Sequence, residues 1–545
     1  MLQLPSLGQD FAILREDKCL YVDKTKFLYE IVKKKGCYFL SRPRRFGKSL
    51  FLGALYELLS GNRSLFEGLW IGSSGYDFKK YPIVRLNMVG SCDSAEVLKK
   101  TIIGKLKNSA FKSGIDNFWI DTPDGVLEEL VNKLNRQTGE RVAVLIDEYD
   151  APILAMIGNK EQALANRGVL QSFYSALKSL VDQGMISYVF VTGVTKFAKT
   201  SIFSVFNNLY DLTLNPGFNA VCGFTLEEFE SYFQEYLPIV LDHNKANGFM
   251  PADATLADLK NEILGYYDGY SWNGEERLLN SFSLIQMLSE KEFQSYWFST
   301  GTPTFLLDFL KRDGGKFDLP DKAEMTRDEL DAADVENLKL IPIMFQTGYL
   351  TIDKRLGPRA YLLRRPNTEV SEALSRNILG YLLGQGQESI TRLRERIGNA
   401  LENHDSGELS DCFHQILTWT SHVEHRAVEG NYLGLLGSVL KAMHFTALFQ
   451  LNESEGVMDF MVTLGKKAAF IFEFKYEKFD SDPKSDRTQE EMDADRLGLL
   501  SRALERAKRQ IAFRKYDEKY QYEYGTVKKV AVAIVGKTDV AVEIY

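Results

Sequence analysis

Between residues 37 and 213 the sequence alternates short apolar runs with amphipathic stretches. Four runs have the length and continuity of buried strands: CYFLS, YPIVRLNM, RVAVLIDEYD and ISYVFVTGVT. Unbroken apolar runs are typical of parallel strands that are covered on both faces. Helical patterns separate them, one after the first run, two between residues 94 and 134, and one at 163–180. The alternation predicts an α/β domain built on a parallel sheet.

Downstream of residue 223 the strand pattern weakens. Aromatic-rich helical stretches lead into NLKLIPIMFQTGYLTI and RAYLLRRP, which predict a small hairpin. From residue 367 to 445 the pattern is helical; GVMDFMVTLGKKAAFIFEFKYEK then predicts a hairpin or meander, and VKKVAVAIVG a further strand after a long helix. We predict three domains: an α/β domain at 1–222, a helical and winged-helix-like lid at 223–366, and a second α/β domain at 367–545.

Composition is that of a soluble globular protein, since 45% of the 545 residues are hydrophobic and 26% are charged. A net charge of −8 excludes an all-basic surface, so any nucleic-acid contact must come from a local patch. No apolar run approaches the roughly 18 residues that span a bilayer, and no signal peptide is evident. The five cysteines never take C-x-x-C spacing, which predicts free thiols in a reducing compartment. We expect a cytoplasmic protein without membrane contact, and a homo-oligomer remains open.

The stretch SRPRRFGKSLF, residues 41–51, ends like a phosphate-binding loop. Gly47, Lys48 and Ser49 stand between an apolar strand and a helix, the context in which backbone N–H groups and a helix N-terminus face phosphate. Lys48 would then reach the β- and γ-phosphates of ATP, and Ser49 would bind Mg²⁺. Arg42 occupies the position of the first glycine in the usual G-x-x-x-x-G-K-[ST] pattern.

Polar residues at the ends of the next two buried strands add to this site. Asp147 and Glu148 end RVAVLIDEYD, which suits one carboxylate on Mg²⁺ and the next polarising the attacking water. The alternative is two surface acids at a strand end. Thr192 and Thr195 could sense the γ-phosphate, although a strand-end cap is the plainer role for either hydroxyl. Further polar candidates nearby are Asn207 and Asn208.

Eight stretches follow one another along the chain: YVDKTKFL, RPRRFGKSLF, LIDEYDAPI, TGVTKFAKTSIFSVFNNLYDLT, CGFTLEEF, YDGYSW, TGTPTFLL and FQTGYLTI. Together they resemble the bacterial AAA-ATPase-like family, whose members commonly carry a C-terminal nuclease-like domain of the PD-(D/E)XK type. The resemblance covers nearly the whole chain. It implies a P-loop NTPase with a RecA/AAA-like parallel sheet, then the lid, then a restriction-endonuclease-like α/β domain.

In this family the loop has the form R-P-R-R-F-G-K-S, so the resemblance implies that Arg42 is no sign of decay. A loop without its first glycine must turn with the rigidity of Pro43 instead. Arg44 and Arg45 would lend charge to the phosphates, with a solvated basic loop as the alternative. The predicted ATP-binding residues are Arg44, Arg45, Phe46, Gly47, Lys48, Ser49, Leu50 and Thr195.

The resemblance also implies a second site, where two acids on neighbouring strands hold a divalent metal and a lysine faces the scissile phosphate. Asp459 lies in VMDFMV, and Glu473 and Lys475 lie in FIFEFKY. Residues two apart on a strand share a face, and this pair interrupts an apolar strand where charge is costly. An exposed strand face is the alternative. Met458 stands where the family's name has proline.

Accessory residues of this second site are less well marked. An upstream glutamate often completes such sites; Glu429 is our candidate and Glu424 its rival. SRALERAKRQIAFRKYDEKY predicts a helix whose basic residues could follow a phosphate backbone, and the family pattern places Gln510 beside the metal. SHVEHR, with His422 and His425, has the wrong spacing for a zinc protease and is set aside.

The sequence thus predicts an ATP-binding and ATP-hydrolysing protein whose nucleotide state controls a metal-dependent nuclease domain acting on nucleic acid, DNA before RNA. The expected cofactors are ATP and Mg²⁺, with Mn²⁺ as an alternative at the nuclease site. The predicted catalytic residues are Glu148, Asp459, Glu473 and Lys475, and the predicted metal ligands are Ser49, Asp147, Asp459 and Glu473. Two rival functions stay open: a nucleotide-dependent scaffold that binds nucleic acid or protein without cutting, and an ATP-binding regulator with negligible turnover.

Overall fold

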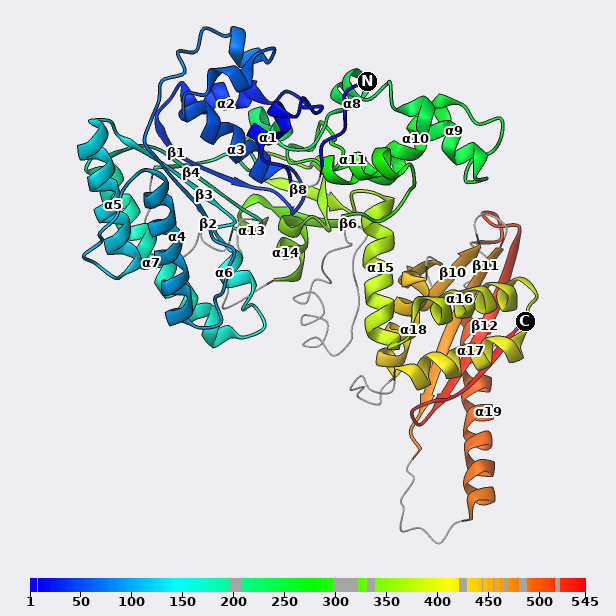
Figure 1. Cartoon of the computed structure of the whole chain (residues 1–545). Coiled ribbons are helices and arrows are strands. Elements are labelled where there is room, and N and C mark those ends of the chain that lie inside the picture. The colour runs from blue at the N-terminus through cyan, green and yellow to red at the C-terminus, as the bar shows by residue number, and fades with distance from the viewer. Residues whose placement is uncertain are drawn as a thin grey trace. The chain divides into compact units, whose positions relative to one another are not determined.

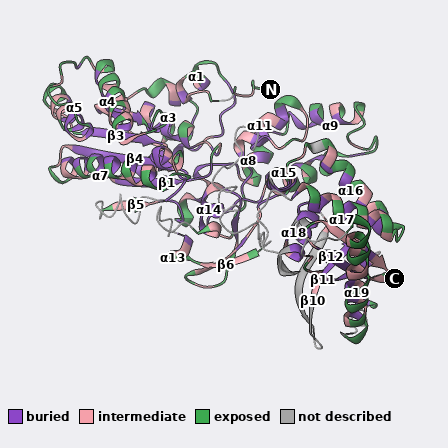
Figure 2. Cartoon of the chain, turned by 90° about the horizontal axis from the view of Figure 1, so that it is seen from below, coloured by how far each residue is buried: buried purple, intermediate pink, exposed green. Residues whose placement is uncertain are grey.

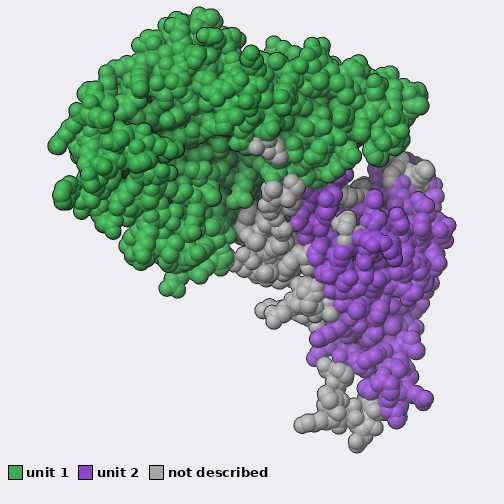
Figure 3. Space-filling view, viewed as in Figure 1, with its two compact units in different colours: residues 1–301, 321–371 green, residues 302–320, 372–545 purple. Residues whose placement is uncertain are grey.

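The chain divides into two compact units (Figure 3). Unit 1 comprises Met1–Gly301 and Asp321–Ser371, and unit 2 comprises Thr302–Pro320 and Glu372–Tyr545. Of the segment predicted as a lid, residues 223–301 and 321–366 belong to unit 1. The borders predicted at 222 and 366 stay predictions. The computed structural model describes residues 1–6, 8–196, 208–297, 322–330, 339–420, 429–443, 445–453, 456–464, 468–479, 488–514 and 520–545.

A five-stranded parallel sheet forms the centre of unit 1 (Figure 1). Its order is β2-β3-β4-β1-β5. β3 and β4 are buried along their whole length, which the unbroken apolar runs predicted (Figure 2). The α/β fold class is confirmed, but the pattern missed β5, a three-residue strand. The strands are β1 Gly36–Ser41, β2 Ile83–Asn87, β3 Val142–Asp147, β4 Ile186–Gly193 and β5 Leu209–Asp211.

Long helices pack on this sheet, and their side-chain caps explain where they begin. Ser94, Thr122 and Asn159 each accept a hydrogen bond from a backbone N–H in the first turn of α4, α5 and α7. The helices are α3 Lys48–Leu59, α4 Ala95–Lys112, α5 Pro123–Thr138 and α7 Lys160–Asp182. Shorter elements of this part are α1 Phe11–Glu16, α2 Thr25–Val32, η1 Arg63–Phe66, η2 Trp70–Ser73 and α6 Ala151–Leu154.

The middle of the chain is helical, as predicted. Capping boxes begin two of its helices, where Thr225 pairs with Glu228 and Thr255 with Asp258. Their aromatic residues form a core of their own around Phe229, Phe233 and Tyr267. The elements are η4 Pro216–Val221, α8 Leu226–Tyr232, α9 Leu237–Ala246, α10 Leu256–Tyr267 and α11 Ser281–Glu290.

A three-stranded antiparallel sheet, in the order β6-β8-β7, closes unit 1. β7 Thr351–Arg355 and β8 Ala360–Arg364 form the predicted hairpin, and β6 Lys322–Thr326 joins it. The first half of NLKLIPIMFQTGYLTI differs from the prediction because it forms helix α14, Leu340–Thr347, which ends at Gly348 with φ 94°. Helix α13, Arg327–Leu330, precedes it.

Unit 2 pairs a helical layer with a mixed sheet in the order β13-β12-β11-β10-β9. β11 and β12 are parallel, joined through the long helix α19, and the other pairs are antiparallel. The predicted hairpin is part of a meander, β9 Thr446–Glu453, β10 Gly456–Leu464 and β11 Ala468–Glu477. The remaining elements are α15 Thr368–Leu383, α16 Gln387–Glu402, α17 Ser406–Trp419, α18 Glu429–Ala442, α19 Gln489–Arg514, β12 Thr526–Val535 and β13 Asp539–Ile544.

Two exclusions predicted from composition can be checked against the part of the chain that the structure describes. Within it, no helix combines the length and the apolar character needed to cross a membrane. All five cysteines are free, as predicted, and all five are buried, where a thiol packs as a small apolar residue.

Candidate nucleotide and metal sites

The phosphate-loop geometry forms between β1 and α3. Gly47 precedes the helix in the left-handed conformation, with φ 90°, which favours glycine. The loop therefore directs the free N–H groups of the first turn of α3 outward, where an anion can meet them. Lys48 is buried; its Nζ donates to the Pro43 carbonyl at 3.0 Å and lies 3.7 Å from Glu148 Oε1.

Arg42 anchors the loop from within. Its side chain is fully buried and lies 4.1 Å from the ring centroid of Trp272. Burial lowers the pKa of its guanidinium to about 10, so it stays charged at neutral pH. It donates hydrogen bonds to the backbone carbonyls of Ser41, Thr213, Phe218 and Asn219, at 2.9–3.3 Å. The arginine thus holds the loop to the 213–219 segment, in place of the turn that a first glycine would supply.

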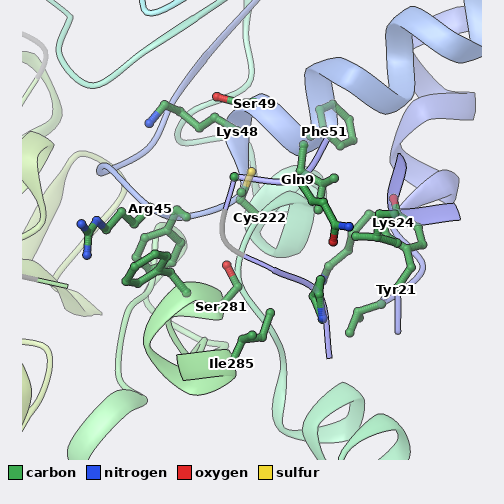
Figure 4. A pocket seen from close by; sticks show the side chains of 18 of the residues that line it. Gln9, Tyr21, Lys24, Arg45, Lys48, Ser49, Phe51, Cys222, Ser281 and Ile285 are labelled. Atoms are coloured by element: carbon green, nitrogen blue, oxygen red, sulfur yellow. The ribbon is translucent and has the colours of Figure 1, made fainter. Parts of the chain in front are cut away.

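The three residues that follow Pro43 differ in their surroundings. Arg44 is exposed, and its carbonyl accepts from the Trp297 indole at 3.1 Å. Arg45, at φ 63°, lies 4.1 Å from the Phe282 ring centroid and donates to the Tyr296 carbonyl at 2.5 Å. In Figure 4 the Arg45 side chain extends away from Lys48 and Ser49. Phe46 is buried in the core, against the rings of Tyr270 and Trp272.

Ser49 and Asp147 meet at the mouth of the loop. Ser49, exposed in the first turn of α3, hydrogen-bonds Asp147, which ends β3 and is 4% exposed. Burial raises the pKa of the Asp147 carboxyl, and the bond to Ser49 opposes the rise. A hydroxyl and a carboxylate are hard oxygen donors, and Mg²⁺ commonly takes one or two protein ligands besides water and phosphate. This pair therefore fits the ion.

Glu148 faces Lys48 because of an unusual backbone conformation. Its φ is 50°, the left-handed region that a non-glycine residue seldom adopts, and its N–H donates to Asp147 Oδ1 at 3.0 Å. The turn brings its carboxylate across the loop to Lys48, with 22% of the side chain exposed. Glu148 thus reaches solvent beside the lysine.

The end of β4 is held by Asp150. This fully buried carboxylate accepts from the Thr195 N–H and hydroxyl, both at 2.6 Å, and from the Val194 N–H at 3.1 Å. Burial raises its pKa to about 6, with the Glu148 charge adding to the rise. The Thr195 hydroxyl is therefore bonded to Asp150. Thr192 is also fully buried, Asn208 is exposed, and Asn207 lies outside the described residues.

A cavity of about 380 Å³ opens beside the loop (Figure 4). Gly47–Phe51 form one wall, and others come from residues 5–6, 8–10, 20–24, 221–224 and 281–285. Leu50, one of the predicted ATP-binding residues, lines it. Lys24 also lines it and pairs with Glu228 at 2.6 Å; burial lowers the pKa of this lysine, and Glu228 opposes that. The sequence could not reveal this cavity, since its walls lie far apart along the chain.

The second predicted site lies on the β10–β11 hairpin. Phe460 pairs with Phe472, and Asp459 and Glu473 are the residues that adjoin this pair in their strands. Asp459 Oδ2 accepts from the Phe474 N–H at 2.8 Å. Lys475 Nζ donates to Glu473 Oε1 at 3.0 Å and to the Phe474 carbonyl at 2.7 Å. The two acids and the lysine are thus brought together, with Glu473 fully buried.

The accessory residues of the second site are only partly described. Glu429 begins α18, but its side chain lies outside the described residues, as do Glu424, His422 and His425. Gln510 is half-buried on α19, next to the buried Ile511. Among the described residues no group of three or more His, Cys, Asp or Glu side chains is placed to hold a metal. Asp459 and Glu473 offer two carboxylates, which fits a Mg²⁺ or Mn²⁺ ion that retains water ligands.

Comparison with known proteins agrees with this division. Residues 7–203 match a family model described as a predicted AAA-ATPase, and residues 427–544 match the PD-(D/E)XK nuclease superfamily. The chain is also similar to a protein of Azotobacter chroococcum mcd 1, described as an uncharacterized protein in the vnfD 5′ region. The two are 34% identical over 484 residues, which is 87% of this chain and 89% of that protein.

Proposed function

Because the chain belongs to the predicted AAA-ATPase family and ends in a PD-(D/E)XK nuclease superfamily domain, we propose that it is a cytoplasmic ATPase whose nucleotide state controls a metal-dependent nuclease. The substrate is nucleic acid, and DNA is favoured over RNA. One observation carries the ATPase part of this proposal. The loop residues Gly47, Lys48 and Ser49 meet the carboxylates of Asp147 and Glu148 beside a cavity that can hold the nucleoside.

Each residue of the loop has a task in this proposal. Lys48 exchanges the Pro43 carbonyl and Glu148 for the β- and γ-phosphates, since a phosphate is the stronger partner for its charge. Glu148 is thereby released to orient the attacking water. Ser49 and Asp147 would hold Mg²⁺, and the bound ion would supply neutralisation of the phosphate charge. Arg42 holds the phosphate loop and Asp150 holds the end of β4, and neither side chain touches the nucleotide.

In unit 2 the proposal assigns Mg²⁺ or Mn²⁺ to Asp459 and Glu473, and phosphate contact to Lys475. The bound ion would supply Lewis-acid stabilisation of the phosphate charge. Lys475 first has to leave Glu473, to which it donates at 3.0 Å. Its cation would then face the scissile phosphate or the attacking water.

One observation favours the alternative of a nucleotide-dependent scaffold that binds without cutting. Glu473 is fully buried and its Oε1 is held by Lys475 at 3.0 Å, so a metal bound at that oxygen has to replace the lysine. A domain in which the pair never opens would bind nucleic acid or protein and leave it intact.

A direct assay separates the two functions. The purified full-length chain is incubated with labelled single- and double-stranded DNA and RNA, with Mg²⁺ or Mn²⁺, and phosphate release and strand cleavage are followed in parallel. We expect ATP hydrolysis that Lys48→Ala removes, and cleavage that requires the metal. Lys33→Ala, at an exposed lysine that pairs with Glu30 at 2.5 Å, is the control. Nucleic-acid binding without cleavage under every nucleotide and metal condition would establish the scaffold instead.

A further inference from the structure

Helix α19 carries a row of three arginines and a phenylalanine along one side. Arg502, Arg506, Arg509 and Phe513 are spaced four, three and four residues apart, so helical geometry places them on one face. All four are exposed, and Phe513 is 78% exposed. Another side of the same helix is buried through Ala503, Ala507 and Ile511. We call the four exposed residues the arginine row.

Two of the three arginines of the row form no ion pair with a residue that the structure describes. Among the described residues neither Arg502 nor Arg509 makes an ion pair, whereas nearby Lys508 is neutralised by Glu505 at 3.1 Å and Glu543 at 2.5 Å. The first turns of α19 are acidic, so the positive charge is confined to the second half of the helix. A chain with net charge −8 thus presents a local basic patch, the form in which nucleic-acid contact was expected.

One ion pair ties the row to the strand that carries the candidate metal site. Arg506 Nη2 lies 2.6 Å from Glu477 Oε1. Glu473, Lys475 and Glu477 alternate along β11, so they share one face of the sheet. A nucleic-acid strand bound at Glu473 and Lys475 would therefore lie beside the arginine row. This argument rests on the proposed nuclease function and adds to it the surface that holds the substrate.

We propose that the arginine row binds the phosphates of a single-stranded stretch of the nucleic-acid substrate and that Phe513 stacks on one of its unpaired bases. Arginine forks suit phosphate oxygens, and an exposed aromatic ring can stack on any base that is not paired. From Arg502 to Phe513 the helix rises about 16 Å, a length over which a single strand presents several phosphates. In a duplex the bases are stacked on one another, so Phe513 would gain little there.

The test measures binding of the full-length chain to a labelled 20-nucleotide single strand and to the matching duplex, in EDTA so that nothing is cut. The row variant carries Arg502→Gln, Arg506→Gln and Arg509→Gln. The charge-matched control carries Arg392→Gln, Arg394→Gln and Lys537→Gln, three exposed positions of the same unit. Melting curves check that all variants remain folded.

We expect the row variant to bind the single strand at least about 30-fold more weakly and to lose roughly two to three units of the slope of log K against log salt. The control should stay within about threefold of wild type, because its charges lie off the row. Phe513→Ala should weaken single-strand binding about tenfold and leave duplex binding unchanged.

The binding data distinguish a failure of the arginine row from a failure of the proposed function. Wild-type binding with an unchanged affinity and salt slope in the row variant would overturn the arginine row while leaving the proposed function standing. An equal loss in the control would also overturn it, since the effect would then be one of total charge. No binding by the wild type, with or without ATP, would remove the proposed function as well. Equal effects of Phe513→Ala on single strand and duplex would overturn the assignment to unpaired bases.

Discussion

The two candidate sites are assembled in opposite ways. In unit 1 the loop, the carboxylates and the cavity walls come from segments far apart along the chain, and they meet because parallel strands end at one edge of the sheet. In unit 2 the two acids and the lysine come from one hairpin, where strand register alone places them together. One site depends on a whole fold and the other on a local pairing.

The lysines show what this difference means for function. Lys48 lies 3.7 Å from Glu148 beside a cavity of about 380 Å³, so a phosphate can take the place of the carboxylate without rebuilding the loop. Lys475 instead donates a hydrogen bond to Glu473 at 3.0 Å, and Glu473 is fully buried. We therefore propose that the nucleotide site is preformed, whereas the metal site opens when Lys475 leaves Glu473. A site that must open is one that a second site can control.

The largest expected effect lies in unit 2. Asp459→Asn or Glu473→Gln should reduce cleavage more than about 10³-fold, because a metal supplies several kcal/mol of transition-state stabilisation. Both variants should also lose the rise in melting temperature that Mg²⁺ or Mn²⁺ gives to unit 2 of the wild type. Lys475→Ala, by contrast, should keep that rise and lose cleavage, since a cation is no ligand. Acid variants that cut at the wild-type rate would show that the hairpin is not the site.

A similar substitution in unit 1 should separate binding from chemistry. Glu148→Gln preserves shape and hydrogen bonding but removes the base, so turnover should fall about 10²- to 10³-fold while ATP still binds. Single-turnover phosphate release and equilibrium ATP binding are the two measurements. Unchanged turnover would make Glu148 a structural residue and direct attention to Asp150, whose carboxylate is bonded to Thr195.

The stability of unit 1 should depend on pH through Glu369. This fully buried carboxyl accepts from the Ser283 hydroxyl and the Trp297 N–H, and burial raises its pKa to about 7. A raised pKa means that the folded state binds the proton more tightly, so stability falls as pH rises from the unfolded value toward 7. Glu369→Gln should match the wild type near pH 5 and exceed it by on the order of 3 kcal/mol at pH 8.

Denaturant unfolding at several pH values is the measurement for Glu369. A constant difference between wild type and Glu369→Gln across this range would contradict the buried, protonated carboxyl. The result sharpens the comparison because Glu369 holds Trp297, whose indole donates to the Arg44 carbonyl of the phosphate loop.

The smallest of these effects concerns the loop anchor. Arg42→Lys retains the charge but loses the planar fork that donates to four carbonyls, so unit 1 should lose about 2 kcal/mol of stability. The matched change Arg44→Lys, at an exposed position, should cost less than about 0.5 kcal/mol. Equal costs from thermal or denaturant unfolding would show that Arg42 does not anchor the loop.

The same contrast explains how much the sequence could predict. The four long strands of unit 1 and the β10–β11 hairpin followed from apolar patterning, and the triplet Gly47–Ser49 followed from its strand–helix context. The anchoring of Arg42 and the position of Asp150 did not, because both depend on contacts between remote segments. The helix α14 was missed because its short apolar run, ended by Gly348, has no period that distinguishes it from a strand.

The central claim is that the preformed nucleotide site governs the closed metal site. The most direct test is the rate at which full-length protein cuts one labelled single strand in Mg²⁺, with ATP, with a non-hydrolysable ATP analogue, and without nucleotide. We predict at least about a tenfold difference between nucleotide states in the wild type, and in Lys48→Ala a single rate equal to that of the nucleotide-free wild type. Cleavage by the wild type at one rate in all three states would contradict the claim.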